Sequence, residues 1–535
     1  MAVVGTLAAL QVASTLAFAL AVQHNGWVWF HGGDQIWLAT QAWLLGDLQL
    51  APTEPAYLWP ALLAPLTWAT GPAYVQALPV LVVVQVLVLA PLALVCLYAL
   101  ATRIGGRLLG YWAALLWVVA PYAAIPLFAD RYQERWAEHF LPQALGLTSL
   151  TDFPSMVVVL AAALFVARSL PPARMPDAVF AGLLAGAAGA LKPPNYLFLA
   201  GALLAYAAAR RWRAGAAFAL AVAPSVFVLA LWKERGLGEL PALALEGARL
   251  AAGAGPLALE LNLDRYLDLD VEHWRTQMDQ LREFFWSARL AQWAPFAGLL
   301  AVLRVRRGAL AALLAGWLGA FLVVKGFSPR ADIQENTFWR LLMPAWPAYL
   351  LLFASIPLLV PTLPRLLGHR LQPAPPRPLR ARWLVVAAAV TAVLPGAAIA
   401  VSSPLEPPPT KAVVQAFAGG NIVTPVIRSL EPEVERTPEG VRLTWSDGGP
   451  WRANVFFRVY RTDGAEPDTS CLVSGGTAWY CSLRGTVLGT TRETAFLDAS
   501  APPRATYRVG VGTNWLDDED EGDVFALSPP VRAPR

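Results

Sequence analysis

Residues 74–101 read YVQALPVLVVVQVLVLAPLALVCLYALA, a predominantly apolar run without a single charged side chain. A helix of roughly 20 apolar residues is long enough to cross about 30 Å of hydrocarbon. This run therefore predicts a membrane-spanning helix. Pro79 and Pro91 predict kinks within it, which membrane helices tolerate because neighbouring groups satisfy the freed backbone carbonyls.

Similar runs recur from Met1 to about Val401 and then stop. Only 15% of the 535 residues are charged, whereas a typical soluble protein has about 25%. The first run lacks the basic start and the small-residue cleavage site of a signal peptide, which favours a retained helix. The sequence thus predicts a mainly α, polytopic membrane bundle of about eleven spans, at residues 2–22, 74–101, 108–128, 152–170, 177–192, 195–209, 214–232, 291–304, 308–324, 340–360 and 383–402.

Arginine is distributed unevenly between the loops that alternate along these spans. The short loops of one set carry Arg103, Arg107, Arg168, Arg174, Arg210, Arg211, Arg213, Arg304, Arg306, Arg307, Arg365, Arg370, Arg377, Arg380 and Arg382. Because basic short loops face the cytoplasm, we expect a multi-pass cell-membrane protein with a cytoplasmic N-terminus. The odd number of spans then makes the C-terminal domain extracytoplasmic. The net charge of +4 does not indicate a nucleic-acid partner.

The pattern changes after the last predicted span. Residues 403–424 begin with a proline-rich stretch typical of a semi-rigid linker. Residues 425–535 contain short alternating stretches, such as Val441–Trp445, Val455–Tyr460 and Thr506–Val511, separated by turn residues. This alternation predicts a small all-β, immunoglobulin-like sandwich. The expected organisation is therefore a membrane domain (1–402), a linker (403–424) and an extracytoplasmic domain (425–535).

The C-terminal domain resembles a fibronectin type III domain at four aromatic positions. These are Trp445 in an early strand, Phe457 and Tyr460 in the next, and the late Tyr507. The resemblance implies a module used for binding or spacing.

Two of the three cysteines, Cys471 and Cys481, lie in this C-terminal domain. In an oxidising outer compartment such a pair indicates a disulfide, although two reduced thiols are also compatible with the sequence. Cys96 lies within a predicted span and is expected to be an inert apolar residue.

Acids and bases gather where the predicted spans meet the outer loops. Asp34 follows the first span and Asp152 opens the fourth; each is either a functional carboxylate or a helix cap. Lys192 ends a glycine-rich apolar hairpin, and Arg340 enters the tenth span from outside. Such cations either pair with a phosphate or carboxylate, or extend to the membrane surface.

In their order along the chain, these motifs resemble the GT-C superfamily of membrane glycosyltransferases, in the branch of protein mannosyltransferases and aminoarabinose transferases. The resemblance covers about residues 1–400 and rests on Asp34, the segment Tyr57–Pro65, Asp152, Lys192-Pro193 and Arg340–Pro344. Many members carry Asp-Glu in the first loop, whereas this chain has Asp34-Gln35. A role of the second acid would be lost here or moved to Glu54.

The resemblance implies transfer of a sugar from a polyprenyl-phosphate donor to an extracytoplasmic acceptor hydroxyl of a cell-envelope glycan, lipid or protein. Asp34 would accept the hydroxyl proton, and Asp152 would stabilise the positive sugar ring or hold the acceptor. Lys192 and Arg340 would bind the departing phosphate. A divalent metal cation could assist, with Glu54 and His273 as candidate acceptor or metal residues.

Two other functional classes, a transporter and a non-catalytic surface protein, are alternatives to a glycosyltransferase. A transporter would place polar residues deep within several spans and could show an internal repeat, neither of which we find in the sequence. The alternative to an enzyme is a non-catalytic, membrane-anchored surface protein that presents the fibronectin type III-like module. The Asp34-Gln35 departure keeps that alternative open.

Overall fold

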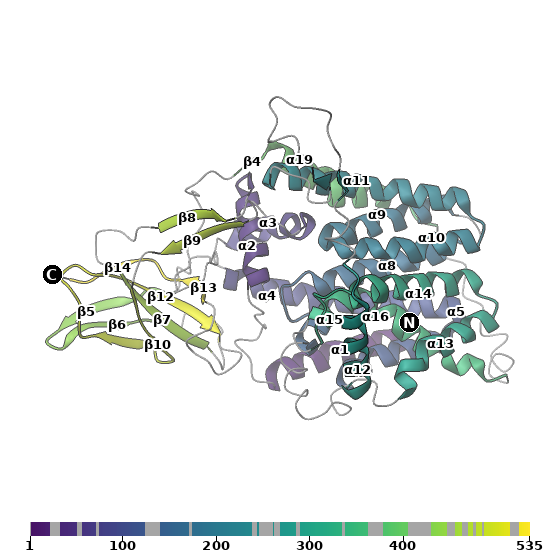
Figure 1. The fold of residues 1–535 in the computed structure, drawn as a ribbon, viewed down its shortest axis with the longest axis horizontal. Helices are drawn as coiled ribbons and strands as arrows, with labels where there is room; N and C mark the ends of the chain where they lie inside the picture. Colours follow the sequence, from purple (N-terminus) through teal and green to yellow (C-terminus); the bar gives the residue numbers. More distant parts are fainter. Residues whose placement is uncertain are drawn as a thin grey trace. The chain divides into compact units, whose positions relative to one another are not determined.

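The computed structural model describes residues 2–21, 33–50, 56–70, 74–123, 140–170, 174–237, 243–244, 260–261, 268–284, 289–333, 337–361, 378–404, 430–446, 455–462, 469–474, 478–483, 486–513 and 524–534. These residues form two units (Figure 1). The first unit comprises residues 1–17, 83–231 and 239–396, and the second comprises residues 18–82, 232–238 and 397–535. The expected division at 402 and 425 stays a prediction, because residues 405–429 lie outside the described residues.

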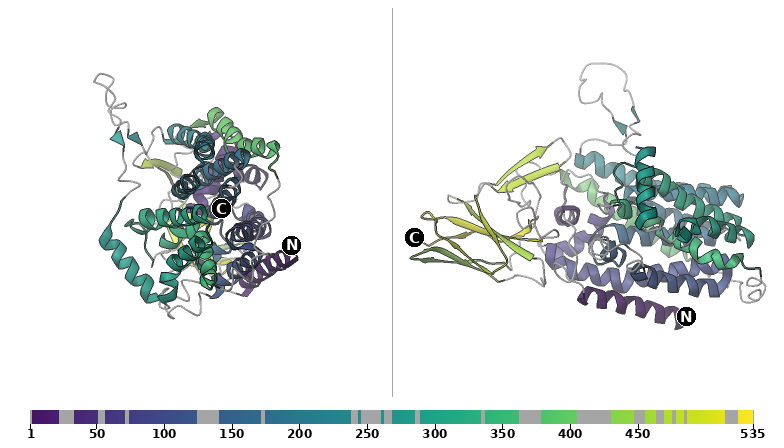
Figure 2. Two further views of the ribbon diagram at one scale, coloured as in Figure 1. Left: turned by 90° about the vertical axis from the view of Figure 1, so that its right-hand side faces the viewer. Right: turned by 60° about the horizontal axis from the view of Figure 1, so that its bottom comes forward.

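The first unit is a bundle of long apolar helices. Its main helices are α5 (Ala90–Ala123), α8 (Asp152–Ser169), α9 (Met175–Leu191), α10 (Phe198–Ala208), α11 (Trp212–Leu237), α13 (Arg289–Arg304), α14 (Gly308–Phe321), α16 (Trp346–Ser355) and α18 (Ala381–Ala388). Figure 2 looks along several of them in its left view. Helices α1 (Ala2–Ala21), α4 (Tyr74–Val84), α11 and α19 (Leu394–Val401) each contribute residues to both units.

Seven helical stretches among the described residues are long and apolar enough to cross a membrane. They run over 2–21, 79–123, 152–169, 212–236, 308–326, 337–359 and 381–401, and the shorter apolar helix α9 lies beside α8. These stretches confirm a helical membrane protein. The predicted number of spans stays a prediction, because several predicted spans correspond to helices below the length of a full crossing.

A break divides the longest of these stretches. Gly106 has a φ of +86°, and Gly105 also leaves the helical conformation. A side chain at Gly106 would be strained in this left-handed region, which glycine adopts freely. The break separates the spans predicted at 74–101 and 108–128 and lies next to Arg103 and Arg107.

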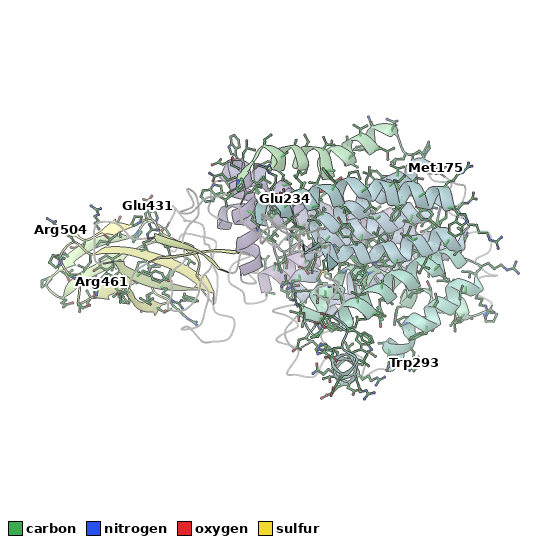
Figure 3. All side chains as sticks on the ribbon, turned by 45° about the horizontal axis from the view of Figure 1, so that its top comes forward. Met175, Glu234, Trp293, Glu431, Arg461 and Arg504 are labelled. Carbon is green, nitrogen blue, oxygen red and sulfur yellow. The ribbon has the colours of Figure 1, made fainter. Side chains whose placement is uncertain are left out.

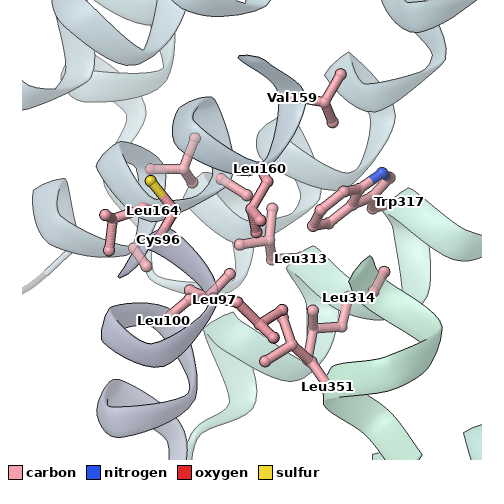
Figure 4. Close-up of a cluster of buried hydrophobic side chains, with 14 of the residues drawn as sticks. Cys96, Leu97, Leu100, Val159, Leu160, Leu164, Leu313, Leu314, Trp317 and Leu351 are labelled. Atoms are coloured by element: carbon pink, nitrogen blue, oxygen red, sulfur yellow. The ribbon is translucent and has the colours of Figure 1, made fainter. Parts of the chain in front are cut away.

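The bundle core combines large side chains with close backbone contacts. Figure 4 shows Cys96, Leu160 and Trp317 from three different helices meeting in it. Helix α10 lies directly against α14, because a Cβ on Gly201 would fall 2.5 Å from the backbone nitrogen of Trp317. Small residues that permit such approach are typical of membrane-helix interfaces. At the periphery, Trp293 on α13 (Figure 3) is 60% exposed, as expected for a lipid-facing residue.

An ion pair joins helices α8 and α9 at each end. Asp152 in the first turn of α8 binds Lys192, which caps the C-terminus of α9. At the opposite end, Arg168 Nη2 lies 3.1 Å from Oδ1 of the buried Asp177. Asp152 and Arg168 are separated by about 24 Å at 1.5 Å rise per residue. The two helices are therefore antiparallel, and each buried acid is paired with a cation.

In the second unit, α2 (Gly33–Gly46) packs against α3 (Leu58–Thr70). Two short strands pair in this unit: β1 (Gln49–Leu50), which follows α2, is parallel to β4 (Ser403–Pro404), which follows α19.

The C-terminal part of the second unit is a β domain of two main sheets and a hairpin. One sheet has the order β11 (Ala495–Asp498), β6 (Gly440–Thr444), β5 (Glu433–Thr437). The other has the order β10 (Thr486–Thr491), β7 (Val455–Thr462), β12 (Thr506–Thr513), β13 (Val524–Leu527), with β14 (Val531–Arg532) also pairing with β12. The hairpin consists of β8 (Thr469–Ser474) and β9 (Ala478–Leu483). A β domain after the helices was predicted and is confirmed.

Side chains join the two main sheets of the β domain. Trp445, just after β6, meets Phe457 of β7 edge to face, with 5.5 Å between the ring centroids. Arg461 of β7 (Figure 3) binds the buried Asp498 of β11 at 2.8 Å. The hydroxyl of Tyr507 donates to the same carboxylate, also at 2.8 Å. The late tyrosine noted in the sequence thus lies in the core, between the sheets.

Candidate functional site

Asp152, Lys192 and Arg340 meet at one end of the bundle, although they are far apart in sequence. The ammonium of Lys192 donates to Oδ1 of Asp152 and, at 3.0 Å, to the backbone carbonyl of Arg340. Nε of Arg340 lies 3.7 Å from Oδ2 of Asp152. The Asp152 side chain is 1% exposed, whereas those of Lys192 and Arg340 are 15% and 25% exposed. A buried carboxylate thus holds two more accessible cations in place.

The local backbone explains why each residue reaches this position. Asp152 begins α8, where a carboxylate also faces the favourable end of the helix dipole. Lys192 ends α9, because Pro193 and Pro194 cannot continue it and start the 3-10 turn η4 (Pro193–Leu197). Arg340 lies on the short helix α15 (Thr337–Leu342), followed by the turn η6 (Met343–Ala345) that packs against α8.

The site carries more positive than negative charge among the described residues. Asp152 offsets only one of its two cations. Lys325 lies within electrostatic reach of Lys192 and Arg330, and it adds a further positive charge that sequence analysis did not assign. It ends the π-helical turn η5 (Leu322–Gly326), which packs against α15. Such an excess favours an anionic ligand, and guanidinium and ammonium groups suit a phosphate.

An apolar cavity of about 390 Å³ lies between the helices next to these charges. Trp339, adjacent to Arg340, and Met156, one turn after Asp152, both line it. Further lining residues are mostly apolar and come from α5, α14 and α16, with Trp117, Leu318 and Trp346 as examples. A cationic cluster whose neighbours Trp339 and Met156 line an apolar cavity is suited to an amphiphilic anion.

Three uncharged polar residues next to Asp152 were missed by the sequence analysis. Gln85, Gln143 and Thr148 are each 0–1% exposed. Gln85 begins the π-helical turn η1 (Gln85–Leu89), and such turns are frequent at functional sites. The available signal was Gln85 itself, an isolated amide in the apolar run Val80–Leu94, since polar residues inside a span are functional candidates.

The structure describes the other three candidate residues, Asp34, Glu54 and His273, only in part. Asp34 lies in the first turn of α2, but its side chain is outside the described residues, as is Glu54 altogether. Nε2 of His273 lies 2.7 Å from the carbonyl oxygen of Ala331 and 3.1 Å from the amide nitrogen of Gln277. Gln277 donates to the same carbonyl, so the pair attaches the amphipathic helix α12 (Val271–Phe284) to the loop at Ala331.

The described residues do not provide a site that fits a divalent metal. Among them no group of three His, Cys, Asp or Glu side chains comes together. Asp152 is already engaged by two cations, and His273 by a backbone carbonyl. We therefore derive no step through a metal.

The two cysteines of the β domain face each other in the backbone pairing of the hairpin. Cys471 of β8 and Cys481 of β9 are direct partners in the antiparallel register. Their side chains lie outside the described residues, and the disulfide stays a prediction.

Comparisons with known proteins give a likeness to solved structures only. No protein-family model matches the chain, and no curated protein matches it. A solved structure of an oligosaccharyltransferase from Archaeoglobus fulgidus, in its apo form, aligns with 77% of this chain at 14% identity and a TM-score of 0.36. This chain spans 56% of the length of that protein. At this TM-score the likeness does not support a function. The function proposed below is based on the residues of the site.

Proposed function

We propose that this protein is a membrane glycosyltransferase that moves a sugar from a polyprenyl-phosphate donor to an extracytoplasmic hydroxyl. The observation that carries the proposal is the convergence of Asp152, Lys192 and Arg340 beside an apolar cavity. The cations suit the phosphate, and the cavity suits the first isoprene units of the lipid. Membrane lipid would surround the bundle, and the acceptor would be a cell-envelope glycan, lipid or protein.

The reaction requires four changes that the proposed residues could support. The acceptor oxygen bonds to the anomeric carbon of the sugar, and the bond from that carbon to the phosphate oxygen breaks. The hydroxyl proton passes to a carboxylate, for which Asp34 is the candidate. The phosphate leaves with one additional negative charge, which Lys192 and Arg340 would offset.

Asp152 would have two roles in this scheme. Its Oδ1 holds Lys192, which fixes the position of the cation. Its Oδ2 makes no hydrogen bond within the described part of the chain. It forms an ion pair with Nε of Arg340 at 3.7 Å but keeps its hydrogen-bonding capacity, with which it could accept a bond from a sugar hydroxyl.

The β domain would act as a fibronectin type III-like binding or spacing module. Its support is the strand order, with sheets β11-β6-β5 and β10-β7-β12-β13, together with Trp445 and Tyr507 in the core. Sandwiches of this architecture consist of two antiparallel sheets of three and four strands.

Deletion of the gene, followed by complementation, tests the enzyme. We expect the deletion to remove one sugar from the cell envelope, measured by glycan composition analysis, and the wild-type gene to restore it. Asp34→Asn and Asp152→Asn should each fail to restore it, with transfer reduced at least 100-fold, the lower range for general acid–base and electrostatic contributions. An unchanged envelope after deletion would favour the non-catalytic surface protein.

Asp177→Asn is the matched control for Asp152→Asn. Both changes remove a buried carboxylate that pairs α8 with α9, but at opposite ends of the two helices. The control should retain transfer if Asp152 acts in the chemistry. Equal losses in equally abundant variants would mean that the pairs only hold the bundle together.

A further inference from the structure

Gln85, Gln143 and Thr148 form a buried polar cluster beside Asp152 that the reaction above does not use. The amide of Gln85 donates to the backbone carbonyl of Thr148 at 2.7 Å. A Cβ on Gly146, which lies between Gln143 and Thr148, would meet the Cβ of Gln85 at 3.2 Å and the ring of Phe153 at 3.0 Å. Phe153 follows Asp152 directly. The cluster is therefore built from η1, the short helix α7 (Leu141–Ala144) and the segment leading into α8.

Several polar atoms of this cluster have no hydrogen-bond partner among the described residues. They are Oε1 of Gln85, both Oε1 and Nε2 of Gln143, and Oγ1 of Thr148; Oδ2 of Asp152, at the start of α8, likewise makes no hydrogen bond in the described part of the chain. Leaving such an atom buried and unpaired costs about 1–3 kcal/mol. Hydrogen bonds to a bound polar ligand would offset this cost for several atoms at once.

The chemistry of these atoms indicates what the ligand carries. Amides and hydroxyls both donate and accept hydrogen bonds, as sugar hydroxyls do. None of the three residues is charged, and the nearby excess of positive charge from Lys192, Lys325 and Arg340 disfavours a cationic group. Gln143 also lines the apolar cavity, and its amide is buried directly behind that wall, so a small rotation of the side chain would turn it toward a bound ligand.

We propose that Gln85, Gln143 and Thr148 form a subsite for an uncharged, hydroxyl-bearing sugar of the donor lipid. The subsite rests on the proposed function and makes it more specific, because it selects neutral sugars over amino sugars. The phosphate would lie at Lys192 and Arg340, and the sugar would lie beside Oδ2 of Asp152.

Lipid binding by the full-length protein in detergent tests the subsite. The probes are undecaprenyl phosphate, the same lipid carrying glucose, and the same lipid carrying glucosamine with a free amine. In the wild type we expect the glucosyl lipid to bind more tightly than the glucosaminyl lipid. Gln143→Met should weaken binding of the glucosyl lipid about tenfold, the loss of one to two net hydrogen bonds, and leave binding of the bare phosphate lipid unchanged.

Thermal unfolding separates a ligand-binding amide from a structural one. Because the Gln143 side chain makes no bond within the described residues, Gln143→Met should leave the melting temperature unchanged or raise it. Ser225→Ala is the matched control, since Ser225 is also buried with an unpartnered oxygen but lies on α11. It should leave binding of all three lipids unchanged.

Each alternative outcome is distinct. Equal weakening for the glucosyl and bare lipids, or no weakening by Gln143→Met, would overturn the sugar subsite while leaving the phosphate site standing. Tighter binding of the glucosaminyl lipid would overturn its preference for neutral sugars. If the wild type binds none of the three lipids, the proposed function fails, and the subsite with it.

Discussion

Asp498 in the β domain illustrates how a single buried carboxylate can join two sheets. Burial by itself raises the pKa of this carboxyl group, but hydrogen bonds from Arg461, Tyr507 and Ser500 outweigh burial and lower the pKa below its usual value. Burial and the bond to Asp498 raise the pKa of Tyr507, so the phenol stays protonated and continues to donate. The folded domain thus stabilises the ionised form of the Asp498 carboxylate.

This arrangement predicts a stability contribution that depends on pH. Because the pKa of Asp498 is lowered on folding, its contribution is complete above the unfolded value of about 3.9 and is lost as the pH falls through the folded value. Asp498→Asn should destabilise the β domain by about 3 kcal/mol at pH 7, the lower end of the range for a broken buried ion pair, since it leaves Arg461 without its partner.

Hydrogen exchange of β12 peptides in the full chain measures this effect. The difference between the wild type and Asp498→Asn should shrink as the pH is lowered from 7 to 3. Glu433→Gln, on an exposed position of β5, should change exchange little at either pH. A difference that stays constant with pH would contradict the ionised pairing.

Individual helices and strands of this chain are predicted by short sequence patterns. Which helix or strand pairs with which is determined by a few side-chain and backbone contacts. Helices α8 and α9 have apolar sequences that fit many neighbours, but their two ion pairs fix one antiparallel register. The β8–β9 hairpin is fixed by its register, which places Cys471 opposite Cys481. Directly opposed residues have Cβ atoms about 4.5–5.5 Å apart, close to the separation that a disulfide bridges.

We predict that Cys471 and Cys481 form a disulfide in the protein isolated without reductant. Mass spectrometry of a non-reduced digest should give the two peptides joined, lighter by two hydrogens than the free pair. Cys96 is an internal control, because it is a free, buried cysteine and should become alkylated only after denaturation. Alkylation of all three thiols in the unreduced, denatured protein would exclude the bridge.

At the scale of the whole first unit, charge is divided between the two ends of the bundle. One end carries Asp152, Lys192 and Arg340. At the other end of α8, Arg103 interacts electrostatically with Arg168. Arg103 also interacts with Arg174 and Arg307, which lie in helix connections. Three of the five arginine-rich loops that the sequence assigned to one side, those of Arg103, of Arg168 and Arg174, and of Arg307, therefore lie near one another. Their assignment to the cytoplasm follows the positive-inside rule.

Reporter fusions test this orientation. Fusions of alkaline phosphatase and of green fluorescent protein after Ser402 should report an outer location, with phosphatase activity and no fluorescence. The same fusions within Arg304–Arg307 should report an inner location. Two fusion sites that report the same side would contradict both the orientation and the odd number of spans.

Local patterns in the sequence were enough to predict the membrane helices, the β domain and the candidate charges. Apolar runs without charges can be stable only in hydrocarbon or in a large core, so their nature is a local property. Asp152, Lys192 and Arg340 were identifiable because charges beside hydrocarbon are costly and need a reason. The break between two spans lies next to the arginines that had marked a loop there.

The contacts between these groups, by contrast, are visible only in the folded bundle. Hydropathy does not say which faces of neighbouring helices pack together, so the pairing of Asp152 with Lys192 could not be derived from it. The cluster of Gln85, Gln143 and Thr148 was not foreseen, because each residue alone is ordinary and only the turn at η1 and the short helix α7 bring them together. The physical reason is that a site of this kind is made by side chains from distant segments, whose contacts depend on close packing of the whole bundle.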